Sequence, residues 1–426
     1  MLQRIAGAGA QIADYGDGNK VTIVPNDTAM VQYQKFIAKL EAEGYVLYVD
    51  NSATELAEFV KTATYVKEQN YFTVTHMIKA QKTYLSYCED RELSSHLKYD
   101  NSYVTNNIRG AKTKLHNLEM FWFGNSLVIQ LKNGHFIISD GGLENRGGLL
   151  SDAEYLMQYL EDLVPQGTKP VVDAWVISHL HSDHCGVFTD FVTEAIDANR
   201  LYVEGIYYNE PNDTIFDLDP FSKQVRDDVK KAAKLLQTTS GGHPARYRLQ
   251  TGQRYYFNDI TMDIVLAQEQ MTRDNYVNVE FPEDPKKSNF NDSSTWCMFT
   301  IEGQKVLFMG DADKGGMDVV MDTYNKEYLT LTGVVVSHHS WNPYQVWVDY
   351  ITVDAVIVPG GEFTTAEDEY VVNFCPERIQ WYAQNSALEA KAKEVIAWGK
   401  GTVTMTFPYA PGNLEVKEKK QRKEES

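Results

Sequence analysis

The spacing of apolar residues changes near residue 119 and divides the chain into two differently patterned parts. In the first part, Val31, Phe36, Ile37 and Leu40 recur at helical spacing, which predicts a helix that begins after residue 26 or 27 and ends at Gly44. Strand-like runs follow at residues 45–49, 71–77 and 83–88, and the polar stretch 99–114 has no period and is typical of a linker. We therefore expect residues 1–112 to form a small α+β domain, whose role the sequence does not indicate.

From about Glu119 onward, strands alternate with helices. The turn Lys132-Asn133-Gly134 predicts a hairpin between strands at 126–131 and 135–139. Further strands are predicted at residues 171–178, 253–267, 295–301, 305–309, 334–337 and 353–358, and helices at 152–163, 221–236 and 378–396. Two successive sets of strands with helices between them predict an α/β fold over residues 117–412, with two packed sheets and helices outside. The segment 413–426 mixes charges of both signs and is predicted to be a disordered tail.

Composition narrows the class of protein. The chain has 426 residues, of which 43% are apolar, and this is enough for a large core. Its formal net charge of −19 repels phosphate backbones at long range, so we do not expect a nucleic acid partner. No run approaches the ~18 apolar residues of a membrane span, and we expect no membrane partner. Four cysteines lie far apart in the sequence: Cys88, Cys185, Cys297 and Cys375. We expect them to be reduced thiols of a cytoplasmic protein.

The strongest chemical signal is the segment His-Leu-His-Ser-Asp-His-Cys-Gly at residues 179–186, which follows an apolar strand. His179 and His181 are separated by one residue and can present both imidazoles to one metal ion. Asp183 and His184 turn the other way and can serve a second ion. Imidazole and carboxylate ligands together suit zinc, iron or manganese. Three histidines and an aspartate within six positions predict a metal site.

Two later segments also follow apolar strands. Asp311 comes directly after a glycine, where its carboxylate can bridge two cations, although an aspartate at such a position is also a common turn or cap residue. His338 and His339 are adjacent on a predicted loop, so one can be a metal ligand while the other faces a substrate. Taken alone, they would be interpreted as surface histidines.

In this order, HxHxDHxG, a downstream Gly-Asp and a later His-His resemble the motifs of the metallo-β-lactamase-fold hydrolases, over residues 117–410. The segment Asn-Asp-Ser-Ser at 291–294, followed by a hairpin, GDAD and SHHS, is most similar to one branch of that superfamily. This branch contains the hydrolase domain of bacterial DNA-uptake channel proteins (ComEC-like) and the phosphorylcholine esterases. The resemblance implies a four-layer αββα sandwich.

The resemblance also implies a site for two divalent metal ions, with zinc expected first and manganese or iron as alternatives. The implied ligands, in chain order, are His179, His181, Asp183, His184, Asp311 and His339. The first two would hold one ion, the next two would hold the other, and Asp311 would bridge the pair. His339 would complete the second ion, with His338 facing the substrate, and these two roles can be exchanged.

Other positions match the resemblance less fully. Asp140, in an Asp-Gly-Gly turn, corresponds to an aspartate that is usually structural. Many members supply a third histidine to the first ion, and His243 is the one histidine of this chain in the corresponding interval. A loop histidine before a proline is the plainer interpretation of His243. Ser340 stands where the family often has glycine.

The predicted activity is hydrolysis of a small phosphoester by a hydroxide that bridges two metal ions. Asp183 and His338 are the expected catalytic residues, the latter because it can contact a phosphoryl oxygen or protonate the leaving group. A nuclease is the nearer alternative, and a lactone, thioester or β-lactam hydrolase is the more remote one. A different class also stays open, namely a non-catalytic metal-binding scaffold for a protein partner. The sequence does not indicate the oligomeric state.

Overall fold

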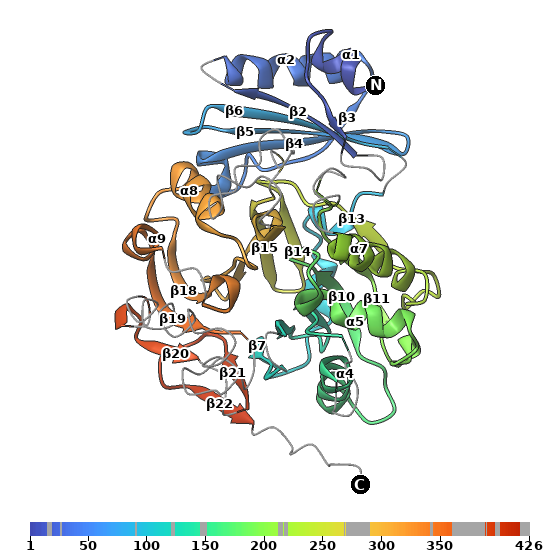
Figure 1. Cartoon of the computed structure of the whole chain (residues 1–426), viewed down its shortest axis with the longest axis vertical. Helices are drawn as coiled ribbons and strands as arrows, with labels where there is room; N and C mark the ends of the chain where they lie inside the picture. The colour runs from blue at the N-terminus through green and yellow to red at the C-terminus, as the bar shows by residue number, and fades with distance from the viewer. Residues whose placement is uncertain are drawn as a thin grey trace.

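The computed structural model describes residues 1–14, 19–25, 28–89, 92–120, 124–144, 151–211, 216, 220–267, 269, 290–340, 344–359, 388, 390–396 and 401–417. An antiparallel sheet lies at the N-terminal end of the molecule, in the order β1-β2-β6-β5-β4-β3 (Figure 1). Its strands are β1 (Ala13–Asp14), β2 (Asn19–Pro25), β3 (Val46–Asp50), β4 (Val60–Lys67), β5 (Asn70–Met77) and β6 (Lys82–Cys88). The helices α1 (Leu2–Ala6) and α2 (Ala29–Ala42) cover one face of this sheet. The predicted helix is therefore present, preceded by Thr28 and followed by Gly44 with φ 80°.

A second sheet has the order β13-β12-β10-β9-β8-β7-β21-β22, with β11 also paired to β10. Its strands are β7 (Lys114–Asn117), β8 (Ser126–Gln130), β9 (Phe136–Asp140), β10 (Val171–Val176), β11 (Tyr202–Val203), β12 (Gly205–Tyr207), β13 (Ala245–Tyr247), β21 (Thr402–Thr406) and β22 (Leu414–Lys417). The strands β9, β10, β12 and β13 run parallel to one another. They therefore share one edge at which all their carboxyl ends lie.

The third sheet has the order β14-β15-β16-β17-β18-β19-β20. Its strands are β14 (Arg254–Phe257), β15 (Ile260–Leu266), β16 (Trp296–Ile301), β17 (Gln304–Phe308), β18 (Thr330–Val335), β19 (Thr352–Ile357) and β20 (Glu394–Ile396). From β17 to β20 the strands are parallel, so the segments that follow β17 and β18 leave the sheet on the same side.

The second and third sheets pack face to face, with an apolar core between them that includes Ile137, Val176, Phe299 and Phe308. The helices α4 (Asp152–Leu163), α5 (Ser182–Val192) and α7 (Pro220–Ala232) cover the outer face of the second sheet, while α8 (Lys314–Thr323) and α9 (Gln345–Tyr350) cover that of the third (Figure 1). This layer order confirms the predicted four-layer αββα sandwich. The N-terminal sheet packs on the third sheet through its own apolar side chains, among them Val60 and Met77.

Some local predictions were wrong. Leu414–Lys417 forms β22, paired with β21, although it falls in the predicted disordered tail; alternating side chains and an available sheet edge outweigh its charge. Glu394–Ile396 forms β20 at the end of the predicted helix 378–396, and most of that helix lies outside the described residues. Among the described residues, no helix is long and apolar enough to cross a membrane.

Candidate metal centre

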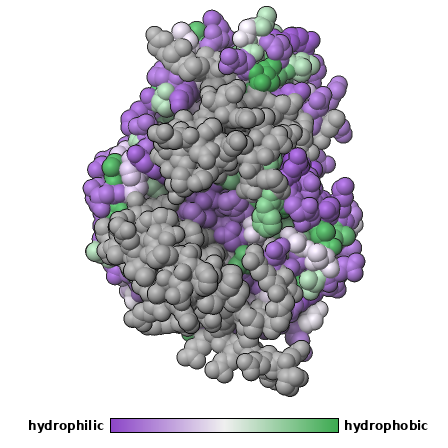
Figure 2. Space-filling view, viewed as in Figure 1, coloured by the Kyte–Doolittle hydropathy of each residue, from purple (hydrophilic) through white to green (hydrophobic). Residues whose placement is uncertain are grey.

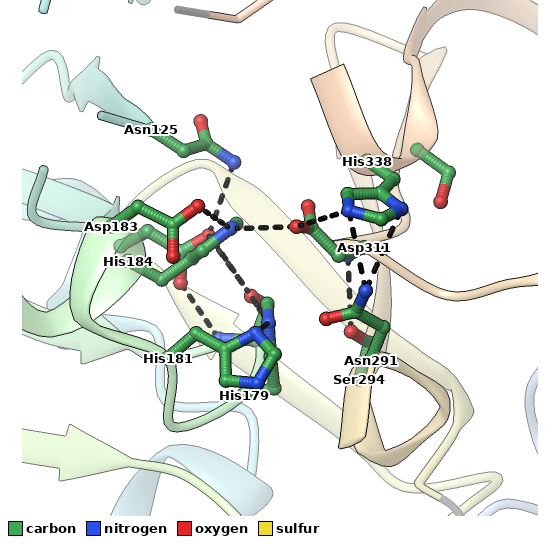
Figure 3. Close-up of polar contacts among 12 residues, drawn as sticks. Asn125, His179, His181, Asp183, His184, Asn291, Ser294, Asp311 and His338 are labelled. Carbon is green, nitrogen blue, oxygen red and sulfur yellow. Dashed lines mark hydrogen bonds and ion pairs between the residues drawn. The ribbon is translucent and has the colours of Figure 1, made fainter. Parts of the chain in front are cut away.

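The carboxyl ends of parallel strands from both sheets meet at one place, and this is where the predicted ligands lie. Asp140 ends β9, and His179 follows β10 in the second sheet. Asp311 and His338 follow β17 and β18 in the third sheet. Figure 3 shows the two groups of side chains facing each other, and Figure 2 shows a hollow of hydrophilic side chains near the middle of the molecule's face. The site is thus built from both halves of the sandwich.

The segment 179–186 is partly helical, because α5 begins at Ser182 and His181 occupies its N-cap position. Asp183 and His184 therefore lie in the first helical turn. The helix packs very closely on the turn after Asp140, since a Cβ on Gly186 would overlap the backbone of Leu143 and Glu144. Glycine at this position lets the helix place His184 beside Asp140.

His184 is completely buried and has carboxylates on both sides of its ring. Its Nδ1 lies 2.8 Å from Asp140 Oδ2, so Nδ1 carries a proton and donates a hydrogen bond to this carboxylate. Its Nε2 faces the other way, 3.2 Å from Asp311 Oδ2 and 3.6 Å from Asp183 Oδ2 (Figure 3). The arrangement directs Nε2 at the place where the carboxylates converge.

Asp140 is itself held by donors from two segments. It accepts hydrogen bonds from Ser178 N (2.8 Å), Ser178 Oγ (3.0 Å) and Asn125 Nδ2 (3.3 Å). Because these bonds fix the position of a buried carboxyl group, Asp140 serves to orient His184. The sequence resemblance implied a structural role for Asp140, and its contact with His184 is one way in which it can have that role.

His179 and His181 also lie together. His179 Nε2 is 3.0 Å from His181 Nδ1, and His179 Nδ1 is 3.1 Å from Ser178 Oγ. The ring of His181 stacks on Phe290, with 5.2 Å between the centroids, and this contact limits its rotation. Cys185 is buried, its Sγ lies 3.3 Å from the His179 carbonyl oxygen, and burial raises its thiol pKa well above the usual value. Its role is therefore packing and not nucleophilic attack.

The third sheet supplies the opposite side of the centre. Gly310 has φ 56°, and a Cβ there would lie 2.7 Å from Ser178 Cβ, so glycine allows the two sheets to approach closely. Asp311 follows it and donates its backbone N–H to Ser294 Oγ at 3.0 Å. Through these contacts Asp311 reaches the edge of the second sheet.

Of the two adjacent histidines, His338 is the one whose side chain the structure describes, and it also faces the centre. Its Nε2 lies 3.9 Å from Asp311 Oδ2 and 3.3 Å from Asn291 Nδ2 (Figure 3). Its φ of 49° lies in the left-handed region, which is uncommon for a residue with a Cβ. The side chain of His339 lies outside the described residues.

The donor set fits divalent metal ions. One nitrogen each from His179 and His184 and one carboxylate oxygen from Asp311 lie within 4.8 Å of one another, and all three residues are buried. Burial opposes the charge of His184, but Asp311, Asp140 and Asp183 outweigh it and raise its pKa well above the usual value. Burial, His184 and His181 lower the pKa of His179 well below its usual value. The carboxylates thus favour positive charge at the centre, while His179 stays neutral and able to bind a metal.

The structure does not bring His243 to this group. It immediately precedes Pro244 and β13, at the amino end of the parallel strands, whereas the centre lies at their carboxyl ends. The side chain is exposed, and Nδ1 lies 2.8 Å from the Leu236 carbonyl oxygen. The candidate third histidine is therefore an ordinary loop residue, because strand direction separates it from the site.

Sequence reasoning missed Ser178 and Asn125, which hold Asp140, and the contacts of Asn291 with His338 and of Ser294 with Asp311. Serine and asparagine are common in turns, so their type carries no signal of this role. The strand partners that bring them to the centre come from distant parts of the chain.

Neither a known family model nor a curated protein matches the chain. Several solved structures are similar to parts of it. A metallo-β-lactamase with a HARLDQ motif from Cronobacter sakazakii is 13% identical over 46% of this chain and 62% of its own, with a TM-score of 0.24. A beta-lactamase domain protein from Burkholderia ambifaria is 15% identical over 52% and 56%, with a TM-score of 0.27. A metal-dependent hydrolase of the beta-lactamase superfamily is 10% identical over 69% and 98%, with a TM-score of 0.36.

The chain spans about 60% of the length of the Cronobacter protein and of a mutant of it that also matches. At these TM-scores the overlays carry no weight beyond the likeness itself.

Proposed function

We propose that this chain is a metal-dependent hydrolase of the metallo-β-lactamase type whose centre takes two divalent ions. Zinc is the metal that we expect. The observation that carries the proposal is the position of His184, whose Nδ1 is held by Asp140 while its Nε2 faces Asp311 and Asp183. A histidine oriented by one carboxylate toward two others is an arrangement typical of a metal ligand.

The proposed assignment of ligands is the one that the sequence resemblance implies. His179 and His181 would hold one ion, Asp183 and His184 would hold the other, and Asp311 would lie between them. The closeness of His338 to Asp311 supports the exchanged assignment, in which His338 rather than His339 is the last ligand.

Bound divalent ions would supply a nucleophilic hydroxide at neutral pH and stabilise negative charge on the attacked group. The chain's own residues would position the ligands. Asp140 and Ser178 hold the imidazoles in place, and Asn291 contacts the ring of His338, where it can orient that ring toward the metal ions.

We propose a small phosphoester as the substrate. Two features support this choice: the similarity of segments 291–294, 310–313 and 337–340 to the phosphorylcholine esterase and ComEC-like branch, and a net charge of −19 that disfavours long nucleic acids. A cytoplasmic location accords with the spaced cysteines and stays a prediction.

The test is hydrolysis of bis-p-nitrophenyl phosphate by protein loaded with Zn²⁺ or Mn²⁺. His184→Ala should abolish turnover, whereas His243→Ala, at the other end of the same sheet, should leave it unchanged. Turnover that survives His184→Ala would contradict the assignment of the centre. Two bound metal ions without turnover would refute the phosphodiester proposal and direct the search to lactone, thioester or β-lactam substrates. Failure with all of these would favour a non-catalytic scaffold.

A further inference from the structure

The face that the N-terminal sheet presents to the rest of the chain carries buried polar side chains among its apolar ones. On β4, Thr62 Oγ1 donates to the carbonyl oxygen of Thr251 at 2.8 Å, and the nearby Asn51 Nδ2 donates to that of Gly252 at 3.1 Å. Gly252 has φ 86°, and a Cβ there would overlap Thr62 Oγ1. The turn at 250–252 is therefore fitted closely into the N-terminal sheet, and its backbone acceptors are satisfied by that sheet.

From this turn, a chain of hydrogen bonds continues into the sandwich. The backbone N–H of Ala267 donates to Thr251 Oγ1 at 2.9 Å, and Asn209 Nδ2 donates to the carbonyl oxygen of Ala267 at 3.2 Å. The same amide nitrogen lies 3.3 Å from Thr295 Oγ1, while Asn209 Oδ1 accepts from Leu249 N at 3.0 Å. Asn209 follows β12 of the second sheet, and Thr295 precedes β16 of the third. One asparagine side chain thus joins both sheets.

The chain of contacts ends at the metal centre. The backbone N–H of Thr295 donates to the carbonyl oxygen of Ser178 at 2.8 Å. Ser178 Oγ then contacts His179 Nδ1 at 3.1 Å and donates to Asp140 Oδ2 at 3.0 Å. Every side chain along this path is buried, with exposed fractions of 3% at Thr62, 7% at Asn209 and 6% at Ser178. Hydrogen bonds in such surroundings are strong and leave little freedom to shift.

We propose that Asn209 is a positioning residue of the metal centre, and that the N-terminal sheet, acting through Thr62, is a working part of that centre and not a separate module. Loss of either contact displaces Ser178, which orients both His179 and Asp140. The inference rests on the metal centre of the proposed function, but it concerns metal affinity and does not depend on which ester is cleaved.

The experiment measures Zn²⁺ affinity by competition with a chelator, together with the absorption bands of bound Co²⁺ and the thermal unfolding midpoint. Asn209→Asp keeps the shape and the Oδ1 acceptor but removes the donor, and we expect an affinity loss of about tenfold or more. Thr62→Val removes one distant hydroxyl, and we expect a loss of up to about fivefold, which corresponds to one net hydrogen bond. Thr62→Ser keeps the hydroxyl and should restore the affinity.

The matched control is Thr73→Val. Thr73 is equally buried on the same face of the sheet, and its Oγ1 contacts Thr64 Oγ1 within that sheet at 3.1 Å. It should lower the unfolding midpoint to a similar extent but leave Zn²⁺ affinity and the Co²⁺ bands unchanged. Equal Zn²⁺ affinities for Thr62→Val and Thr73→Val would overturn the proposal, since the N-terminal sheet would then be only a structural support.

A double-mutant cycle tests whether the two contacts act in one chain. Thr62→Val combined with Asn209→Asp should weaken Zn²⁺ binding no more than Asn209→Asp alone. Fully additive losses would show independent effects and contradict the coupling. Wild-type protein that binds Zn²⁺ but does not hydrolyse any ester would refute the proposed function while leaving this inference standing.

Discussion

Asp140→Asn is the most informative single change at the centre, because it alters the hydrogen-bonding pattern without altering the shape. In the native site, Asp140 Oδ2 accepts from His184 Nδ1, Ser178 Oγ and Asn125 Nδ2, while Oδ1 accepts from the backbone of Ser178. The substitution replaces one of these acceptor oxygens by an NH₂ group.

Either orientation of the new amide is unfavourable. If NH₂ takes the Oδ2 position, it faces His184 Nδ1, which must then accept, and the ring proton moves to Nε2, where it blocks the metal-binding lone pair. If NH₂ takes the Oδ1 position, it faces the backbone N–H of Ser178, and a buried donor is left without an acceptor at a cost of about 1–3 kcal/mol. A loss of metal affinity of about 10- to 100-fold corresponds to about 1.4–2.7 kcal/mol and lies in the same range.

The assay is Zn²⁺ binding by chelator competition, with urea unfolding of the metal-free protein as a second measurement. Both orientations lower the stability of the metal-free protein, because Asn125 Nδ2 loses its acceptor in the first and the backbone N–H of Ser178 loses its acceptor in the second. The first orientation also lowers affinity by moving the ring proton of His184. Asn125→Ala is the control, since it removes one donor to the same carboxylate while His184 keeps its tautomer. Wild-type affinity and wild-type stability in Asp140→Asn would refute the assigned role of Asp140.

Three further predictions concern stability. Burial lowers the pKa of His116 to about 3. As pH falls from 6.5 toward 3, the unfolded chain therefore takes up a proton that the folded chain does not. Between pH 7 and pH 5, urea unfolding should show that wild type loses about 2 kcal/mol of stability relative to His116→Gln. Gly310→Ala should cost about 1–3 kcal/mol more than Gly303→Ala, because both glycines have positive φ but a Cβ meets Ser178 and Ser294 only at Gly310; equal losses in urea unfolding would contradict the close packing of the sheets. Zn²⁺ at 100 times its Kd should stabilise the fold by about 2.7 kcal/mol, seen as a higher thermal midpoint, and His184→Ala should remove this effect.

Local sequence patterns predicted those elements whose signals are also local. Helix α4 has the predicted bounds, because Ser151 caps it with a hydrogen bond to Glu154 N and its apolar residues recur at helical spacing. The hairpin of β8 and β9 follows from the Asn133-Gly134 turn. Helix α8 was missed since two glycines, at 315 and 316, weaken its helical pattern.

Strand β4 was missed for a reason that bears on function. Its Thr62 and Thr64 are buried, yet as polar residues they give no apolar alternation. They are satisfied by contacts with Thr251, Thr73 and Gln253, and the first and last of these lie far away in the sequence. A polar face that is buried against a distant turn has no signature in a local window, so the first domain could be outlined but its attachment could not be predicted.

The same limit applies to the centre. The residue types of the predicted ligands indicated a metal site, but the sequence did not indicate how far apart these residues lie in the structure. The histidine segment and Asp311 lie more than a hundred positions apart, and their proximity depends on how closely two sheets approach. Two glycines shape the centre: Gly186 brings α5 against the turn after Asp140 within one half, and Gly310 brings the third sheet against Ser178 of the other half. Glycine carries no functional group, so a search of the sequence for ligand residues does not identify either position. A metal ion at this place would then add bonds between two halves that backbone packing has already brought within reach, and this is why we expect metal affinity, more than fold stability, to respond to changes along the path from Thr62 to Ser178.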